Sequence, residues 1–255
     1  MGFDEMREAG DVDTIWLDGE FVDWDDAQIH VLTHALHYGT GVFEGVRCYD
    51  TENGPAIFRW DEHLDRFYAS GEPYNLDIPF DREELTEATK ELIRRQDLES
   101  CYIRPVAYYG YDMLGLNPES CPEQVAIAVW PWGAYLGEEA LEEGVEVTVS
   151  SWRKYASSQI PTNAKTTGTY VNSVLASLEA KREGYVEAIL LNQEGNIAEG
   201  PGENLFLVRD GEIYTPGLAE GILDGITRNT VITLARERGY TVHDDATISR
   251  GELNT

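Results

Sequence analysis

Short apolar segments flank an Asp-Gly pair at two places in the chain. At the first place, segments 15–17 and 20–22 lie on either side of Asp18-Gly19. At the second, segments 204–208 and 212–214 lie on either side of Asp210-Gly211. Because a two-residue Asp-Gly loop suits a type I′ turn, both places predict β-hairpins. Longer apolar runs at 101–109, 124–130, 145–150 and 186–191 predict four further strands.

Apolar residues at helical spacing predict helices at 60–70, 81–96 and 168–183, and a fourth from about 227. Asp81 is the expected N-cap of the second helix, and Gly239 is the expected stop of the fourth. Because helices and hairpins do not alternate regularly, we expect an α+β / α/β chain of two domains. These are an α+β domain over 1–130 and a more barrel-like sheet domain over 138–255, with a linker at 131–137.

The composition is that of a folded but strongly acidic protein. Of 255 residues 42% are apolar, whereas 47 acidic residues stand against 19 lysines and arginines, for a net charge of −28. This charge argues against nucleic acid or an anionic membrane surface as a partner. No apolar run reaches the 18 or so residues of a membrane span, and the N-terminus lacks a signal-peptide pattern, so we expect a cytoplasmic protein.

Lysine and cysteine are both scarce. High surface carboxylate with only four lysines leads to the hypothesis of a halophilic protein, since concentrated salt screens the self-repulsion. The three cysteines Cys48, Cys101 and Cys121 lack Cys-x-x-Cys spacing and fit reduced thiols.

One lysine is singled out by its surroundings. The 24 residues 155–178 carry a single charge, Lys165, where the average composition predicts about six. Small and hydroxylated residues surround it. A lysine held away from water has a lowered pKa and a nucleophilic amine, as Schiff-base chemistry requires. On this segment alone, an ordinary solvated lysine is an equally good interpretation.

The segment 28–43 also lacks Asp, Glu, Lys and Arg, and Glu44 follows it directly. The segment contains His30, His34 and His37. On one helix these histidines would share a face and could bind zinc. Gly39-Thr40-Gly41 argues against that helix, and no acidic residue lies between the histidines. Hydrogen-bonded histidines without a metal are therefore the favoured interpretation.

Two further segments could contact a ligand. Gly225 precedes the helix expected near Thr227, where backbone N–H groups could bind phosphate, although a simple capped helix explains the same pattern. Glu199 ends an expected strand before a Gly-Pro-Gly turn, although an exposed turn acid is again a sufficient explanation.

Six segments, taken together, closely resemble the branched-chain-amino-acid aminotransferases, which are pyridoxal-phosphate enzymes of fold type IV. They are 34–47 (HALHYGTGVFEGVR), 102–105 (YIRP), 131–137 (PWGAYLG), the Lys165 segment, 199–206 (EGPGENLF) and 225–228 (GITR). The resemblance extends from Ile15 to Arg250. It implies a small α+β domain followed by a larger, cofactor-binding pseudo-barrel domain.

The resemblance also implies roles at the cofactor. Lys165 would bind pyridoxal phosphate covalently and then move a proton between the substrate α-carbon and the cofactor. Glu199 would pair with the pyridine nitrogen and Tyr170 with the phenolic oxygen. The other implied cofactor-binding positions are Arg66, which with the N–H groups of Ile226 and Thr227 would bind the phosphate, and Leu223 and Gly225.

At the substrate, the resemblance implies an apolar pocket combined with a carboxylate site. Arg104 matches the arginine that receives the distal carboxylate of glutamate. The implied reaction transfers the amino group of L-leucine, L-isoleucine or L-valine to 2-oxoglutarate. The resemblance also implies that the protein is a homo-oligomer and that the site contains no metal. The other implied substrate-binding positions are Tyr38, Phe43, Gly45, Tyr102, Trp132 and Tyr135.

The family continues past the position of Thr255, so the resemblance implies that part of the second domain, with a Gly-Thr-Ala type turn, lies outside this sequence. Alternatives of the same fold are a D-amino acid aminotransferase and an aminodeoxychorismate lyase. Two alternatives of other classes are a truncated, non-catalytic binding module and a zinc protein built on the three histidines.

Overall fold

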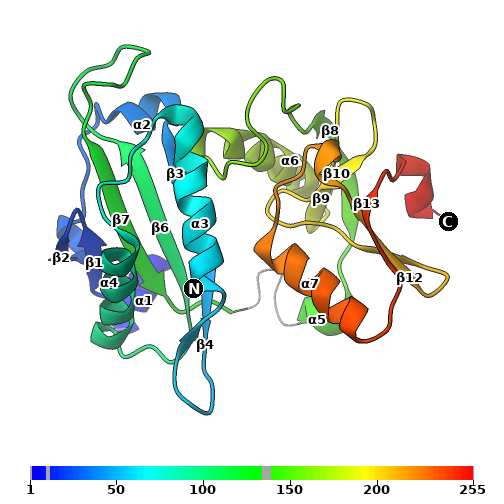
Figure 1. Ribbon diagram of the computed structural model, residues 1–255, viewed down its shortest axis with the longest axis horizontal. Coiled ribbons are helices and arrows are strands. Elements are labelled where there is room, and N and C mark those ends of the chain that lie inside the picture. Colours follow the sequence, from blue (N-terminus) through cyan, green and yellow to red (C-terminus); the bar gives the residue numbers. More distant parts are fainter. Residues whose placement is uncertain (1, 10–11, 134–138, 255) are drawn as a thin grey trace. The chain divides into compact units, whose positions relative to one another are not determined.

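The computed structural model describes residues 2–9, 12–133 and 139–254, and the chain divides into two compact units (Figure 1). The first unit runs to Tyr135 and also includes Lys165–Gly168. The second unit comprises Leu136–Ala164 and Thr169–Thr255. A short loop around Lys165 thus belongs to the first unit, although the residues on both sides of it belong to the second.

A seven-stranded antiparallel sheet forms the first unit. Its order is β2 (Glu20–Asp23), β1 (Thr14–Leu17), β7 (Glu123–Trp130), β6 (Cys101–Tyr109), β4 (Val46–Tyr49) and β5 (Ala56–Ile57), and β3 (Gly41–Phe43) also pairs with β6. The predicted strands at 101–109 and 124–130 are confirmed as β6 and β7. Since β3 and β4 both pair with β6, Glu44 and Gly45 lie at the break between them.

The first Asp-Gly hairpin is confirmed. Asp18 and Gly19 have φ angles of 48° and 94°, both positive as a type I′ turn requires. The Asp18 carboxylate accepts hydrogen bonds from the Val125 N–H at 2.7 Å and from Gln124 Nε2 at 2.6 Å. The turn is therefore attached to β7 as well as to its own hairpin.

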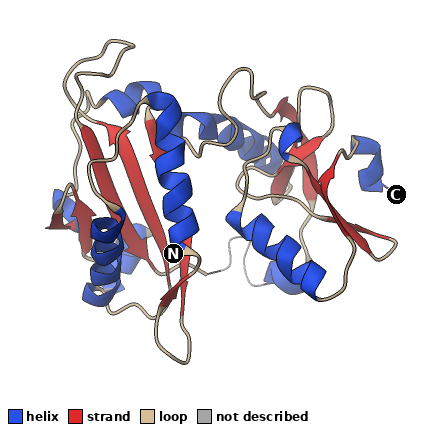
Figure 2. Cartoon of the chain, viewed as in Figure 1, coloured by secondary structure: helices blue, strands red, loops and turns tan. Residues whose placement is uncertain are grey.

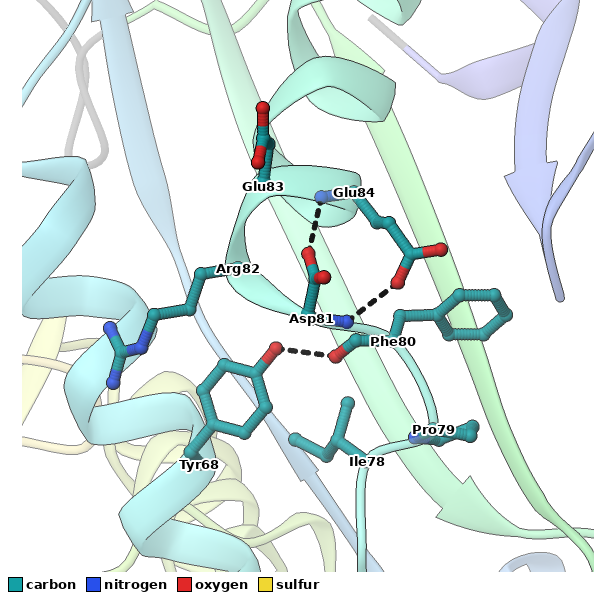
Figure 3. Close-up of a pocket in the computed structure, with 8 residues that line it drawn as sticks. All are labelled: Tyr68, Ile78, Pro79, Phe80, Asp81, Arg82, Glu83 and Glu84. Carbon is teal, nitrogen blue, oxygen red and sulfur yellow. Dashed lines mark hydrogen bonds between the residues drawn. The ribbon is translucent and has the colours of Figure 1, made fainter.

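Helices α3 (Trp60–Gly71) and α4 (Arg82–Arg95) pack on the sheet and supply much of its core, as predicted for 60–70 and 81–96 (Figure 1). Asp81 is the N-cap of α4: its Oδ1 accepts from the Glu84 N–H at 2.9 Å, and Glu84 Oε2 accepts from the Asp81 N–H at 2.8 Å (Figure 3). The shorter helices of this unit are α1 (Phe3–Ala9), α2 (His34–Tyr38), η1 (Trp24–Asp26) and η2 (Glu72–Tyr74).

Two three-stranded sheets form the second unit (Figure 2). One has the order β10 (Ile197–Glu199), β9 (Glu187–Leu191), β8 (Val147–Arg153), and the other has the order β11 (Leu207–Arg209), β12 (Glu212–Pro216), β13 (Val242–Ala246). The pairs β8–β9 and β12–β13 are parallel. The predicted strands at 145–150 and 186–191 are confirmed as β8 and β9.

Two helices of the second unit confirm the predictions at 168–183 and from about 227: α6 (Tyr170–Glu183) and α7 (Ile226–Glu237). Helix α5 (Glu139–Glu143) was not predicted, and η4 (Leu218–Glu220) and η5 (Arg250–Asn254) are short turns of this unit. The turn η3 (Thr167–Thr169) begins in the Lys165 loop, where the chain passes from the first unit to the second. Gly239, the predicted stop, follows the end of α7 with a φ of 86°. Among the helices that the structure describes, none combines the length and the apolar character that a membrane crossing needs.

The second Asp-Gly hairpin is confirmed, but its first strand starts later than predicted. Asp210 and Gly211 have φ angles of 53° and 80°. The strand predicted at 204–208 begins at Leu207, because the residues before it bond to other groups. Asn204 Nδ2 donates to Leu223 O at 3.0 Å, and Leu205 O accepts from Thr215 Oγ1 at 2.8 Å.

The three histidines of the segment 28–43 do not share one helix, since α2 covers only His34–Tyr38. Buried His34 bonds through Nδ1 to Thr40 Oγ1 and through Nε2 to Gly115 O, both at 2.7 Å. His37 Nε2 bonds to Val31 O at 2.9 Å, and the Leu32 N–H donates to His30 Nδ1 at 3.0 Å. Each histidine therefore has its own partner. Over residues 2–9, 12–133 and 139–254, no group of three or more His, Cys, Asp and Glu side chains is arranged to hold a metal ion.

The cysteines Cys48, Cys101 and Cys121 are all buried and free, as expected for reduced thiols. Cys48 and Cys101 are directly paired across β4 and β6. Burial raises the pKa of the Cys101 thiol to about 12, with a further contribution from Cys48. Both side chains therefore act as small apolar core residues.

Candidate active site

The Lys165 loop is attached to the first unit by backbone hydrogen bonds. The Phe43 N–H donates to Lys165 O at 3.0 Å, and Val42 forms an antiparallel bridge with Thr166. The Lys165 N–H donates to Ser70 Oγ, in α3, at 2.9 Å. Strand β3 and helix α3 thus fix the backbone that carries the lysine.

The glycines of the segment 34–47 make room for this loop. The Gly168 N–H donates to Gly39 O at 3.1 Å, and a Cβ on Gly39 would lie only 2.5 Å from Gly168 Cα. Gly39 also has a φ of 65°, which side chains disfavour. Thr167 Oγ1 donates to Gly39 O at 2.9 Å. A larger residue at position 39 would therefore push the lysine loop away.

Lys165 lies half-buried beside an aromatic ring and a pair of opposite charges. Its Nζ is 5.0 Å from the centre of the Phe43 ring. Burial is the main reason why the pKa of Lys165 falls to about 8; the Glu44 carboxylate opposes this change, and the Arg66 guanidinium reinforces it. An amine with this pKa is a nucleophile and a proton carrier near neutral pH.

The lowered pKa predicts that the Lys165 amine reacts at a lower pH than an ordinary lysine. With a pKa of about 8, half of the amines are neutral at pH 8, against ~0.4% for an ordinary lysine with a pKa of about 10.4. We expect trace acetylation of the cofactor-free protein, read by mass spectrometry, to label Lys165 with a midpoint near pH 8. Exposed Lys90 and Lys181 give the reference profile in the same sample. Coincident profiles would contradict this environment for Lys165.

Glu44 holds Arg66 in a buried, two-pronged ion pair. Glu44 Oε1 accepts from Arg66 Nε at 2.7 Å, Oε2 accepts from Nη2 at 2.8 Å, and Oε2 also bonds His63 Nδ1 at 2.7 Å. Burial alone would raise the pKa of Glu44, but the bonds from Arg66 and His63 hold it at about 2. Arg66, the predicted phosphate ligand, is therefore fixed in position by a carboxylate that was not among the predicted site residues.

Arg104 carries a buried donor that is aimed at no acceptor among the described residues. Its Nη2 donates to Tyr102 Oη at 2.9 Å, and its guanidinium lies over the rings of Phe43 and Tyr102, at 4.8 and 5.2 Å from their centres. Arg104 Nε is buried and has no hydrogen-bond partner in the described part of the chain. Because a guanidinium has five N–H donors, Arg104 keeps hydrogen-bonding capacity beyond its bond to Tyr102.

Gly45 has no room for a side chain, because Tyr102 fills the space. A Cβ at Gly45 would lie 2.0 Å from Tyr102 Oη and 2.9 Å from Cζ. Gly45→Ala must therefore displace the ring, and we expect it to lower the free energy of unfolding by about 1–3 kcal/mol in a urea titration. The double variant with Tyr102→Phe, which removes the nearer atom, should recover part of this loss. Unchanged stability in Gly45→Ala would contradict the close approach.

The remaining predicted substrate residues of the first unit differ in exposure. Trp132 is partly exposed and contacts Tyr102 edge-to-face, with ring centres 4.5 Å apart. Tyr38 is exposed, and its Oη donates to Leu114 O at 3.3 Å. Tyr135 lies outside the described residues, as does part of the predicted linker at 131–137.

In the second unit, buried Glu199 at the end of β10 receives three donors. Lys154 Nζ binds Oε1, while the Leu223 N–H and Asn204 Nδ2 donate to Oε2 at 2.9 and 3.2 Å. A carboxylate has about four acceptor directions, two on each oxygen. The three donors therefore leave one acceptor direction, on Oε1, which is the oxygen that Lys154 binds.

Asn204 connects two of the motif segments. Besides Glu199 it bonds Leu223 O at 3.0 Å, and a Cβ on Gly225 would lie 1.9 Å from its Oδ1. Gly225 is thus required by the Asn204 side chain, and it is also the extended residue before α7. Its two successors, Ile226 and Thr227, form the first turn of α7, where backbone N–H groups attract anions. The motifs 199–206 and 225–228 consequently build one structure.

Lys154 is the main site residue that the sequence analysis did not identify. Burial alone would lower its pKa, but the Glu199 carboxylate raises the pKa of Lys154 above the ordinary value. Lys154 is therefore held protonated, whereas Lys165 is poised to lose its proton. The one available signal was the scarcity of lysine, and only Lys165 lies in a segment without other charges.

Tyr170, another predicted cofactor residue, is half-buried in the first turn of α6.

Comparison with known proteins names the family. Residues 41–255 match the family described as Amino-transferase class IV. The chain is 51% identical over 226 residues to the branched-chain-amino-acid aminotransferase of Pseudomonas aeruginosa, a match that covers 89% of this chain and 73% of that protein.

Solved structures give the same result. The branched-chain amino acid aminotransferase of Escherichia coli matches with a TM-score of 0.92 at 48% identity. The T.th. branched-chain amino acid aminotransferase, solved with pyridoxamine 5′-phosphate, matches with a TM-score of 0.90 at 50% identity. Each match covers 94% of this chain and 79% of the other. The chain belongs to the class IV aminotransferases, among which the branched-chain-amino-acid aminotransferases are its relatives.

Proposed function

We propose that this chain is a branched-chain-amino-acid aminotransferase that uses pyridoxal 5′-phosphate. It would transfer the amino group of L-leucine, L-isoleucine or L-valine to 2-oxoglutarate, giving the branched-chain 2-oxo acid and L-glutamate. The observation that carries this proposal is the half-buried Lys165 amine, with a pKa of about 8, in a unit that also presents the unsatisfied guanidinium donor of Arg104.

The residues present fit the cofactor group by group. An aldehyde needs a neutral amine, which Lys165 supplies, and a protonated pyridine nitrogen needs the acceptor direction left on Glu199 Oε1. Tyr170 would bond the phenolic oxygen. The family resemblance assigns phosphate binding to Arg66, and in the second unit it assigns cofactor contacts to Leu223, Gly225, Ile226 and Thr227. Within each unit the groups suit this role, since Arg66 carries a guanidinium held by Glu44 and the first turn of α7 carries free N–H groups. When bound, the cofactor accepts the electron pair released at the substrate α-carbon.

Lys165 would serve both as the attachment point and as the proton carrier. With the cofactor bound, its neutral amine would take up the proton from the substrate α-carbon, hold it, and give it back. A pKa of about 8 suits both steps, because proton transfer is most effective when the pKa of the group lies near the working pH.

The substrate side chain would lie against aromatic residues. Phe43 and Tyr102 lie beside Arg104, and Trp132 contacts Tyr102, so an apolar wall and a carboxylate-binding group adjoin each other. This combination supports acceptance of both a branched aliphatic side chain and the distal carboxylate of glutamate. Tyr38, Gly45 and Tyr135 complete the proposed set.

Two measurements test the function. Protein purified with pyridoxal phosphate is reduced with borohydride and digested, and we expect the reduced adduct on Lys165. A substrate panel of L-leucine, D-alanine and aminodeoxychorismate then separates the activities of this fold, and turnover of L-leucine with 2-oxoglutarate is expected. Turnover confined to D-alanine or to aminodeoxychorismate would overturn the assignment, and absence of any adduct would favour a non-catalytic module.

We further propose that the chain forms a homo-oligomer, dimeric or built from dimers, through an apolar face of the first unit. His34 Nε2 bonds Gly115 O, which joins the segments 29–38 and 111–116. In a chain of net charge −28, nine large apolar side chains are exposed on these two segments. They are Ile29, Val31, Leu32, Leu36, Tyr38, Tyr111, Met113, Leu114 and Leu116. Leu116→Asp should shift the sedimentation coefficient toward that of a monomer, whereas an unchanged coefficient would remove this face from consideration.

The acidic surface and the buried thiols support two finer proposals. Free, buried cysteines fit a reducing compartment such as the cytoplasm. With a net charge of −28, the chain should gain stability as salt screens its self-repulsion, so we propose a halophilic protein. Thermal unfolding across a potassium chloride series should show a rising midpoint, and a flat or falling midpoint would reject the proposal.

A further inference from the structure

Arg47 lies in a row of side chains that crosses three neighbouring strands of the first unit. It is paired with Tyr102 across β4 and β6, and Tyr102 is paired with Trp130 across β6 and β7. Side chains opposite each other in this way share a face of the sheet. Trp132 follows β7 and joins the row: its ring is stacked 5.8 Å from that of Trp130 and lies edge-on 4.5 Å from that of Tyr102.

The guanidinium of Arg47 reaches the backbone where the chain leaves β7. Arg47 Nη1 donates to Trp132 O at 2.6 Å and to Gly133 O at 3.2 Å. Hydrogen bonds from a charged donor are stronger than neutral ones. Trp132 is 38% exposed, so burial alone does not fix it. The two carbonyl bonds hold the backbone that carries the indole, and the two ring contacts hold the indole itself.

We propose that Arg47 is a positioning residue that acts through Trp132 to set the shape of the substrate side-chain pocket. The inference rests on the proposed function, which assigns Trp132 to that pocket. Arg47 Nη1 is bonded to backbone carbonyls, which gives the residue a route to the pocket through the backbone at 132–133. Loss of the guanidinium frees the backbone at 132–133, and the indole then no longer offers a fixed wall to an aliphatic side chain.

The kinetic test uses Arg47→Met, which keeps the apolar stem and removes the donors. We expect KM for L-leucine to rise about tenfold with kcat within about twofold, as for lost binding rather than lost chemistry. Arg47→Lys, which can still donate to one carbonyl, should restore part of the KM. Arg94→Met is the matched control, because Arg94 is an exposed arginine of α4 whose ion-pair partner is Glu91, and it should leave both constants unchanged.

A double-mutant comparison decides whether Arg47 acts through Trp132. In a Trp132→Ala background, Arg47→Met should change KM by less than about twofold, since the wall is already absent. A tenfold change that persists in that background would mean that Arg47 contacts substrate itself, and it would overturn the proposal. An unchanged KM in the single variant would overturn it as well.

A measurement without substrate separates this inference from the proposed function. Protein labelled with 5-fluorotryptophan gives a ¹⁹F resonance for Trp132, identified by its absence in Trp132→Phe. We expect this resonance to move and broaden in Arg47→Met and to return toward its original position in Arg47→Lys. An unmoved resonance contradicts the positioning role. If the wild-type protein fails to transaminate L-leucine, the proposed function fails, and the NMR comparison still decides whether Arg47 positions Trp132.

Discussion

Lys165→Ala is expected to abolish the borohydride-stable adduct and to lower kcat by at least about 10⁴-fold. A positioned acid–base group contributes about 10²–10⁴-fold by proton transfer alone, and this variant also loses the covalent attachment point. Lys154, which is buried in the second unit, is no substitute, because Glu199 holds it protonated. Mass mapping and single-turnover kinetics measure the two effects.

The same variant should stay folded. Burial lowers the pKa of Lys165 to about 8 in the folded chain. Below pH 8 the amine is charged, and this buried charge makes the folded state less stable relative to the unfolded state. Removing it should therefore not reduce the free energy of unfolding at pH 7. Lys181→Ala, on an exposed position of α6, is the control and should keep both adduct and activity. An adduct that persists in Lys165→Ala and maps to Lys154 would reverse the assignment of the two lysines.

Lys154→Met is expected to produce the largest loss of stability, about 3–5 kcal/mol in the free energy of unfolding. Lys154 and Glu199 are each 6% exposed, and their ion pair lies in the second unit. Without the ammonium, a buried carboxylate keeps two hydrogen bonds, from Leu223 and Asn204, but loses its counter-ion. Urea titration followed by circular dichroism measures the change.

A compensating variant separates the lost ion pair from poor packing. Lys154→Met combined with Glu199→Leu removes both charges, and it should regain most of the lost stability because replacing a whole buried pair with apolar residues is often nearly neutral. The double variant should still lose activity, since it lacks the carboxylate that we propose as the partner of the pyridine nitrogen. A loss of stability below about 1 kcal/mol in Lys154→Met would show that the pair is not buried as described.

Local patterns predicted most of the helices and strands because their causes are local. The capping box of Asp81 fixes the start of α4, and the positive φ angles of Asp18-Gly19 fix the first hairpin. The 204–208 segment departed from its pattern because Asn204 bonds Leu223, a residue far along the chain. Where a distant partner competes with local preference, the sequence pattern alone gives the wrong boundary.

The site shows the same division. Lys165 was recognisable because its whole segment lacks other charges, a feature visible in the sequence. Glu44 and Lys154 were not, because each owes its importance to one partner, Arg66 or Glu199, that lies 22 or 45 positions away. In a chain with 47 acidic residues, no local signal distinguishes a buried glutamate from an exposed one.

The assignment of Lys165–Gly168 to the first unit has a consequence for how the gene can be divided. A fragment that stops near residue 135 would encode β3 without the backbone of Lys165 and Thr166 that pairs with it, and would leave a bare strand edge open to aggregation. During synthesis the ribosome must likewise add some thirty residues of the second unit before the first is complete. The two units therefore cannot be exchanged as independent modules by recombination at the 131–137 segment.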